Sequence, residues 1–167
     1  MDFLVHCKIK YFMSIRKLKM FLIVLLLSCS TKVTINAPMK VGVVTSNLGG
    51  RWGKFHYGVD IGVSQGTLVN PIAKGTVTSI KKNHPIFGNR VDIYHPELGL
   101  FSSYSHLKAI YIKESQEVDC QDSLGLSGNT GKSTGPHLHL EVYNRNNVFI
   151  QPLSIIKNHN FTFKKNK

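Results

Sequence analysis

Apolar and polar residues alternate in several short stretches along the middle of the chain, with glycine- and proline-containing turns between them. In the stretch YGVDIGV, residues 57–63, every second residue from Val59 onward is a β-branched aliphatic one. Successive side chains of a strand point to opposite faces, so each stretch predicts a half-buried β-strand. The predicted strands cover residues 40–46, 57–63, 75–82, 89–95, 100–107 and 137–143.

No part of this region repeats apolar residues with the spacing of an amphipathic helix. All 14 glycines fall between Gly42 and Gly135, which marks a turn-rich domain. We therefore expect a single all-β domain over residues 41–156, built mainly of antiparallel twisted sheet. Residues 29–40 are expected to be a tether, and residues 157–167 a basic tail that ends in solvent.

The N-terminal residues have the pattern of an export signal. Basic residues precede the apolar run MFLIVLLL at residues 20–27, which predicts a signal peptide over residues 1–28. The run is shorter than the ~20 apolar residues of a permanent membrane span. Its end, LLSC, resembles a bacterial lipobox, so Cys29 is predicted to become the lipidated first residue. The expected location is the cell envelope, as a periplasmic or membrane-anchored lipoprotein, or alternatively outside the cell.

Cysteine usage and charge narrow the possible partners. Cys120 is the one cysteine within the predicted domain, so no internal disulfide is expected there. The formal net charge of +12 would draw the chain to anionic polymers of the cell wall and to lipid headgroups. Its basic residues are scattered, and no recognition helix or RNA-binding aromatic motif is present, so nucleic acid is not an expected partner.

Two histidines stand two residues apart in the last predicted strand. Leu138, Leu140 and Val142 are expected to face the core, which turns the intervening residues to the opposite face. Those residues are His137, His139 and Glu141. The two imidazoles should therefore share one surface, whatever their role.

Further candidate ligands lie upstream. His56 and Asp60 form an H-x-x-x-D pattern, and His106 lies in the segment YSHL. Imidazole nitrogen and carboxylate oxygen are ordinary zinc ligands, and a catalytic zinc takes three protein ligands and keeps one position open. Each pattern is common by chance, and a lone histidine is more often a hydrogen-bonded structural residue.

The order and spacing of these segments together resemble the M23 family of zinc metallopeptidases, of the LytM and lysostaphin type. The resemblance runs from about Gly49 to Leu153. It rests on GGRWGKFHYGVDIGVSQGTLVNPIAKGTV at 49–77, GNRVDIYH at 88–95, YSHL at 104–107 and GNTGKSTGPHLHLEV at 128–142. It implies the LytM and lysostaphin fold, with a groove at the metal site.

Carried over by position, the resemblance implies that His56, Asp60 and His139 bind one Zn²⁺ per chain. His106 and His137 would be the two catalytic histidines beside the metal. One of them would accept a proton from water and the other would stabilise the oxyanion, an assignment that the sequence leaves open. Selectivity for the bond cleaved is expected in the loops at 46–55, 83–88 and 144–148.

Three more residues match the family pattern without an implied catalytic role. Arg51 corresponds to an arginine often seen upstream of the first ligand, with a structural or substrate-side role. His95 falls where the family often has a structural histidine. Tyr104 either lines the groove or packs as an aromatic at a strand end.

The resemblance implies a zinc endopeptidase that hydrolyses peptide cross-links or bridges of bacterial peptidoglycan. Separately, we expect the chain to be a monomer. One alternative is a non-hydrolytic envelope protein that binds peptidoglycan or activates a cell-wall amidase, and it predicts bound metal without hydrolysis. Another is a basic exported module that binds nucleic acid or acidic polymers, and it predicts little stoichiometric zinc and strongly salt-dependent binding. The presence of all five site residues favours the enzyme.

Overall fold

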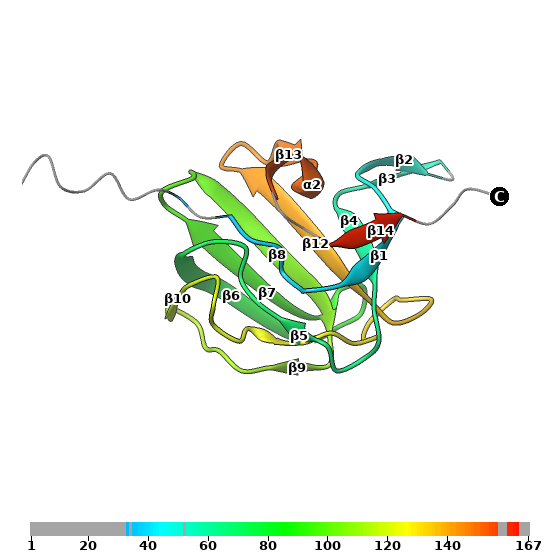
Figure 1. The fold of residues 1–167 in the computed structure, drawn as a ribbon, viewed down its shortest axis with the longest axis horizontal. Helices are drawn as coiled ribbons and strands as arrows, with labels where there is room; N and C mark the ends of the chain where they lie inside the picture. Colours follow the sequence, from blue (N-terminus) through cyan, green and yellow to red (C-terminus); the bar gives the residue numbers. More distant parts are fainter. Residues whose placement is uncertain (1–32, 34, 52, 157–159, 164–167) are drawn as a thin grey trace, which may run out of the picture. The chain divides into compact units, whose positions relative to one another are not determined.

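The computed structural model describes residues 33, 35–51, 53–156 and 160–163 (Figure 1). Within these residues the chain forms short β-strands and a single four-residue helix. The elements are β1 (Gly42–Ser46), β2 (Gly49–Arg51), β3 (Lys54–His56), β4 (Val59–Gly62), β5 (Leu68–Val69), β6 (Gly75–His84), β7 (Gly88–His95), β8 (Leu100–Leu107), β9 (Ala109–Ile110), β10 (Glu117–Val118), β11 (Gly125–Leu126), β12 (His137–Asn144), β13 (Phe149–Ile150), α2 (Pro152–Ile155) and β14 (Phe161–Phe163).

One large sheet organises the described residues. Its strands follow the order β10-β6-β7-β8-β12-β4-β1-β14, and β13 pairs with β12 beside this path. The neighbouring strands are antiparallel except for β1 and β14, which run parallel. A three-stranded sheet, β5-β11-β9, and the β2–β3 hairpin complete the fold. The predicted all-β, mainly antiparallel architecture is confirmed.

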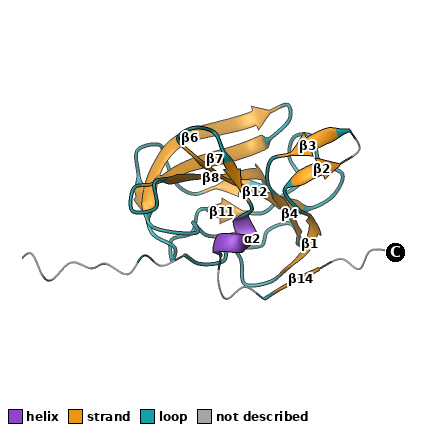
Figure 2. Cartoon of the chain, turned by 90° about the horizontal axis from the view of Figure 1, so that it is seen from above, coloured by secondary structure: helices purple, strands orange, loops and turns teal. Residues whose placement is uncertain are grey.

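The core lies on one face of the large sheet. Leu138, Leu140 and Val142 of β12 are fully buried there, as the alternation predicts. Val69 of β5 and Leu124 belong to the same cluster, which the small sheet and α2 help to cover (Figure 2). Each fully buried aliphatic side chain of this kind contributes about 1.5–3 kcal/mol. The opposite face of β12 is left to the histidines and to Glu141.

The six predicted strands correspond to β1, β4, β6, β7, β8 and β12, with ends shifted by up to two residues. The other strands are only two or three residues long. A period of two cannot be recognised over so few residues. They form because the long strands place their partners nearby, which the sequence pattern does not show.

The structure differs from the expected domain limits at both ends. In the expected tether, Asn36 donates its backbone N–H to the carbonyl of Ile72 at 2.7 Å, and Met39 is buried in the core. In the expected solvated tail, Phe161 is buried and β14 pairs with β1. Both segments therefore pack onto the domain, because each carries apolar side chains that the sheet edge can bury.

The predicted signal peptide and Cys29 lie outside the described residues. In the part of the chain that the structure describes, no helix is long and apolar enough to cross a membrane. Export and lipidation therefore stay predictions from the sequence.

Candidate metal centre

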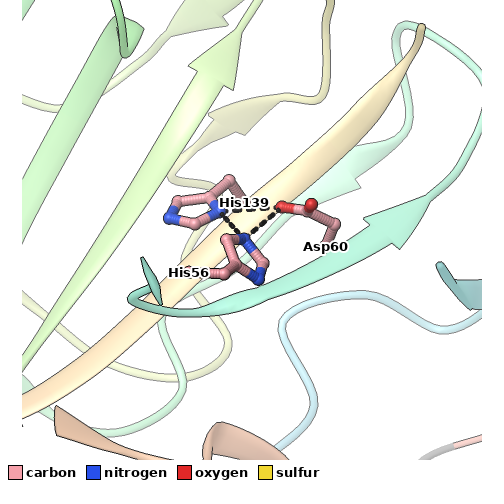
Figure 3. A group of neighbouring side chains, drawn as sticks. All are labelled: His56, Asp60 and His139. Atoms are coloured by element: carbon pink, nitrogen blue, oxygen red, sulfur yellow. Dashed lines mark hydrogen bonds and ion pairs between the residues drawn. The ribbon is translucent and has the colours of Figure 1, made fainter. Parts of the chain in front are cut away.

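Three side chains from separate strands meet at one end of the large sheet. His56 ends β3, Asp60 lies in β4, and His139 lies opposite Asp60 in the pairing of β4 with β12. Figure 3 shows the three side chains pointing toward one another. Oδ1 of Asp60 lies 2.7 Å from Nδ1 of His139 and 3.1 Å from Nε2 of His56. The two imidazole nitrogens are 3.0 Å apart.

In both His56 and His139, the ring nitrogen that points away from Asp60 has a hydrogen-bond acceptor, which fixes the tautomer. Nδ1 of His56 lies 2.8 Å from the carbonyl oxygen of Asn47, which can only accept, so Nδ1 carries the proton. Nε2 of His139 lies 3.0 Å from Oε1 of Glu141, so this nitrogen donates to the carboxylate. In its neutral form, as in metal-binding histidines, each ring would therefore turn a lone pair toward the shared centre.

The charges around Asp60 keep it ionised. Burial raises the pKa of Asp60, but the adjoining imidazoles of His139 and His56 outweigh burial and hold the pKa well below its ordinary value. Nη1 of Arg51, on the β2–β3 hairpin, donates to the other carboxylate oxygen, Oδ2, at 3.0 Å. Burial lowers the pKa of His139, whereas Asp60 and Glu141 raise it by more, so its net pKa is raised.

These observations fit a metal ion. The three side chains are buried, and their ligand atoms lie within 4.8 Å of one another. Two imidazole nitrogens and one carboxylate oxygen are the donor set of a catalytic zinc site. Without a cation between them, two lone pairs would face each other across 3.0 Å beside an ionised carboxylate.

His106 and His137 lie beside this centre, as the resemblance implied. Their ring centroids are 4.6 Å apart, and Nε2 of His137 lies 3.6 Å from Oδ1 of Asp60. Nδ1 of His106 donates to the carbonyl of Thr130 at 2.7 Å, and Nδ1 of His137 to that of Gly135 at 2.8 Å. In the neutral form of each ring the lone pair is therefore on Nε2.

The backbone holds His106 in an unusual conformation. Its φ of +64° lies in the left-handed region, which costs a residue with a Cβ free energy. Its N–H donates to the carbonyl of Phe87 at 2.8 Å. Gly88 and Gly131 approach so closely that a Cβ on either would overlap backbone atoms of the facing loop. Residues 86–88 and 128–131 therefore lock the ring of His106 in place.

Burial also fixes the charge of His106. It lowers the pKa of this imidazole to about 4. The hydrogen bond to the carbonyl of Thr130 opposes this shift, and the neighbouring His137 and His139 add to it. The ring is therefore neutral at pH 7. With Nδ1 protonated, its Nε2 is set to accept a proton.

A buried ion-pair network continues from the metal centre along the sheet. Oε2 of Glu141 accepts from Nη2 of Arg90 at 2.8 Å, and Nε of Arg90 donates to Asp92 at 2.7 Å. Ser103 donates to the same oxygen of Asp92 at 2.5 Å. Sequence reasoning gave no role to these residues, although strand alternation put Glu141 on the face of the histidines. Arg90 and Asp92 are also two residues apart in β7, so strand alternation could have predicted that their side chains share a face.

A hollow of about 440 Å³ opens over the metal centre. Two of the loops expected to set selectivity reach it, through Arg51 and Phe55 on one side and Ile86 and Phe87 on the other. The remaining lining residues are His56, Tyr57, Asp60, His106, Lys132, Ser133, Thr134, His137, His139 and Glu141. The candidate ligands and both flanking histidines therefore face one cleft.

Two other residues that the sequence singled out, Tyr104 and His95, are buried inside the domain. Tyr104 is fully buried on the core face, and its hydroxyl oxygen accepts from the N–H of Ile72 at 2.8 Å. Tyr104 was predicted either to line the groove or to pack as an aromatic at a strand end, and the structure agrees with the second. His95 is also fully buried, between the carbonyl of Lys74 and the hydroxyl of Ser102. Neither lines the hollow over the metal centre.

Comparisons with known proteins agree with this geometry. The sequence profile of peptidase family M23 matches residues 54–152. The peptidoglycan DD-endopeptidase ShyA of Vibrio cholerae is 42% identical over 87 residues, which are 52% of this chain and 20% of ShyA. The catalytic domain of the M23 protein EnpA from Enterococcus faecalis, as an A109H mutant, superposes with a TM-score of 0.64. The two are 27% identical, and the match covers 73% of this chain and 97% of that one.

A solved zinc-containing peptidase from Vibrio cholerae is 30% identical, with a TM-score of 0.59, over 71% of this chain and 40% of that one. The matched curated relatives are much longer proteins. In three of them the match covers 20% to 28% of the relative's length. The shared part is the domain that carries the histidine cluster.

Proposed function

Because the chain belongs to peptidase family M23, we propose that it is a zinc-dependent endopeptidase that hydrolyses peptide cross-links or bridges of bacterial peptidoglycan. The observation that carries the proposal is the convergence of His56, Asp60 and His139, with the far nitrogen of each imidazole already engaged. The relative ShyA is a peptidoglycan DD-endopeptidase, which supports peptidoglycan peptides as the substrate class.

In this proposal His56, Asp60 and His139 hold one zinc ion per chain. Zinc in such a site supplies Lewis acidity, which activates water and polarises a peptide carbonyl. Arg51 holds the second oxygen of Asp60, and Glu141 holds the second nitrogen of His139. These two contacts keep the ligand atoms aimed at the centre and limit their motion when substrate enters.

His106 and His137 carry the proton transfers. Both have a protonated Nδ1 held by a backbone carbonyl, so in its neutral form each offers a lone pair on Nε2. A ring in this state accepts a proton from water as the peptide bond is attacked. It can then donate, either to stabilise the oxyanion or to protonate the leaving amine. The 4.6 Å separation of the rings lets them act on neighbouring atoms of one substrate.

The test is digestion of purified peptidoglycan sacculi, with the released muropeptides identified by mass spectrometry. We expect new amine and carboxyl ends at cross-links or bridges, lost on chelation and restored by zinc. Sacculi with direct D-alanine cross-links and sacculi with glycine bridges would reveal which bond is cut. Bound zinc without new ends on either wall would contradict the proposal and favour the non-hydrolytic alternative.

We further propose that the protein acts in the cell envelope, with Cys29 lipidated after removal of residues 1–28, and that it acts as a monomer. The basic leader, the apolar run and the LLSC sequence support export and lipidation. Labelling with a fatty-acid analogue in cells should modify the wild-type chain but not the Cys29→Ala chain. Equal labelling of the two would contradict lipidation at this residue. Light scattering of the purified chain would test the monomer.

A further inference from the structure

Four aromatic side chains form a row on the face of the large sheet that carries the metal centre. Phe149 of β13 pairs with Tyr143 of β12, Tyr143 with Phe101 of β8, and Phe101 with Tyr94 of β7. Their successive ring centroids lie 5.3, 5.4 and 4.8 Å apart. We call these four residues the aromatic ladder. Three steps between strands of about 4.8 Å give it a length of roughly 14 Å.

The ladder departs from the usual pattern of an antiparallel sheet. One face of such a sheet packs on the core and the other normally carries polar residues. Here the core is on the opposite face, where Leu140 and Val142 are fully buried. The four ladder aromatics are half-buried and do not belong to that core, and Arg145 lies over the ring of Tyr94 at one end. A row of partly exposed aromatics on the face away from the core is a candidate binding surface.

The ladder is continuous with the catalytic hollow. A second hollow, of about 420 Å³, lies beside the first and includes Tyr143 and Phe149 in its lining. The two hollows share Tyr57, Phe87 and Glu141. Tyr57 is 49% exposed, and its ring lies 4.7 Å from that of Phe149. A polymer whose peptide reaches the metal centre would therefore lie against the ladder.

The charges of the second hollow favour a neutral ligand. The charged side chains that line it are Arg90 and Glu141, and these form an ion pair at 2.8 Å. No unpaired cation among the lining residues is left for a carboxylate or a phosphate. Nη1 of Arg90 is buried without a hydrogen-bond partner among the described residues, and Asn147 adds an exposed amide. The hollow therefore offers aromatic rings together with the amide of Asn147 and an N–H donor of an ion-paired guanidinium.

Sugar rings have the matching chemistry. Their C–H groups pack on the electron-rich faces of aromatic rings. Their hydroxyl and acetamido groups hydrogen-bond to amides and to N–H donors. We propose that the aromatic ladder and the second hollow bind the glycan strand of peptidoglycan, as neutral N-acetylhexosamine units, while the attached peptide enters the catalytic hollow. This inference rests on the proposed function for the identity of the polymer.

The test measures glycan binding apart from hydrolysis. The probe is the β-1,4-linked hexamer of N-acetylglucosamine, which carries no peptide, titrated into the 167-residue chain by calorimetry. The variants are Tyr143→Ala and Tyr57→Ala. Tyr57 is half exposed, so its loss leaves the core intact. Tyr111→Ala is the matched control, because Tyr111 is 57% exposed and lies outside the ladder and both hollows. Thermal unfolding checks that each variant is folded.

We expect saturable binding that weakens about tenfold in Tyr143→Ala and in Tyr57→Ala and is unchanged in Tyr111→Ala. Cleavage of a sugar-free cross-linked peptide dimer should be similar in the wild type, Tyr143→Ala and Tyr111→Ala, because neither Tyr143 nor Tyr111 lines the catalytic hollow. Absence of hexamer binding by the wild type would overturn the inference, as would equal binding by wild type and both ladder variants. Tighter binding of a free stem peptide at the same residues would also overturn it.

The two proposals fail separately. If the wild type binds the hexamer through the ladder but cleaves no cross-linked peptide, the hydrolase proposal is wrong and the glycan site stands. If it cleaves the peptide dimer but does not bind the hexamer, the glycan site is wrong and the hydrolase proposal stands.

Discussion

Oε1 of Glu141 accepts a hydrogen bond from Nε2 of His139 at 3.0 Å. This contact leaves Nδ1 of His139 as the nitrogen that faces Asp60 and His56. The other oxygen of Glu141 is held by Arg90. The orientation of one candidate ligand is therefore set by a buried ion pair that points away from the metal centre.

We predict that Glu141→Ala weakens zinc binding about 10–100-fold, because the ring of His139 loses the acceptor that fixes its tautomer and direction. Glu141→Gln should weaken zinc binding less, because its amide oxygen can still accept a hydrogen bond from Nε2 of His139. Competition with a chromophoric chelator would measure the zinc dissociation constant. Glu97→Ala, at an exposed position, is the control. A zinc dissociation constant equal to that of the wild type in Glu141→Ala would contradict this role.

His137→Ala and His106→Ala should keep zinc and lose turnover by about 100-fold or more, the usual contribution of a positioned acid or base. Neither ring is among the three ligand side chains that converge. Steady-state cleavage of a cross-linked peptide, measured beside zinc content, would separate the two effects. Loss of zinc along with activity would instead make the altered histidine a ligand.

Tyr104→Phe should lower the free energy of unfolding by about 1–3 kcal/mol, because a buried N–H of Ile72 loses its acceptor. The same change should leave peptide cleavage intact at temperatures where the variant is folded, since Tyr104 faces the core. Urea unfolding and a cleavage assay on the same preparation measure both quantities. A stable variant with impaired cleavage would place Tyr104 in the groove after all.

The free energy of unfolding should fall as pH drops below about 6.5, in part because of His95. Burial lowers the pKa of His95 from its ordinary value of 6.5. The unfolded chain therefore takes up a proton on His95 at a higher pH than the folded chain does, and protonation favours unfolding. In His95→Gln, stability measured between pH 7 and pH 5 should depend less on pH. Parallel curves for the two proteins would contradict this assignment.

Much of this arrangement follows from local sequence. The alternation in residues 137–143 predicted which side chains of β12 face the core, and those side chains are buried. The pairing of His56 with Asp60 and His139 could be expected from the family resemblance, but not from alternation. It depends on β4 lying next to β12, a contact between residues about 80 positions apart in the chain.

The remaining features depend on the register of distant strands. Arg90 meets Glu141 because β7, β8 and β12 are aligned so that Asp92, Ser103 and Glu141 lie side by side. Nothing in the sequence of β7 alone identifies that partner. Likewise, Phe161 is buried because β14 adds to the edge of the sheet at β1, which made the solvated-tail prediction wrong for that segment.

The most direct test of the metal centre is the number of zinc ions per chain in the purified wild-type protein and in the His139→Ala and His137→Ala variants. Inductively coupled plasma mass spectrometry on protein dialysed against zinc-containing buffer would measure it. We predict one zinc in the wild type and in His137→Ala and almost none in His139→Ala, because His139 supplies one of three converging donors. One zinc per chain in His139→Ala, or none in the wild type, would contradict the site described above.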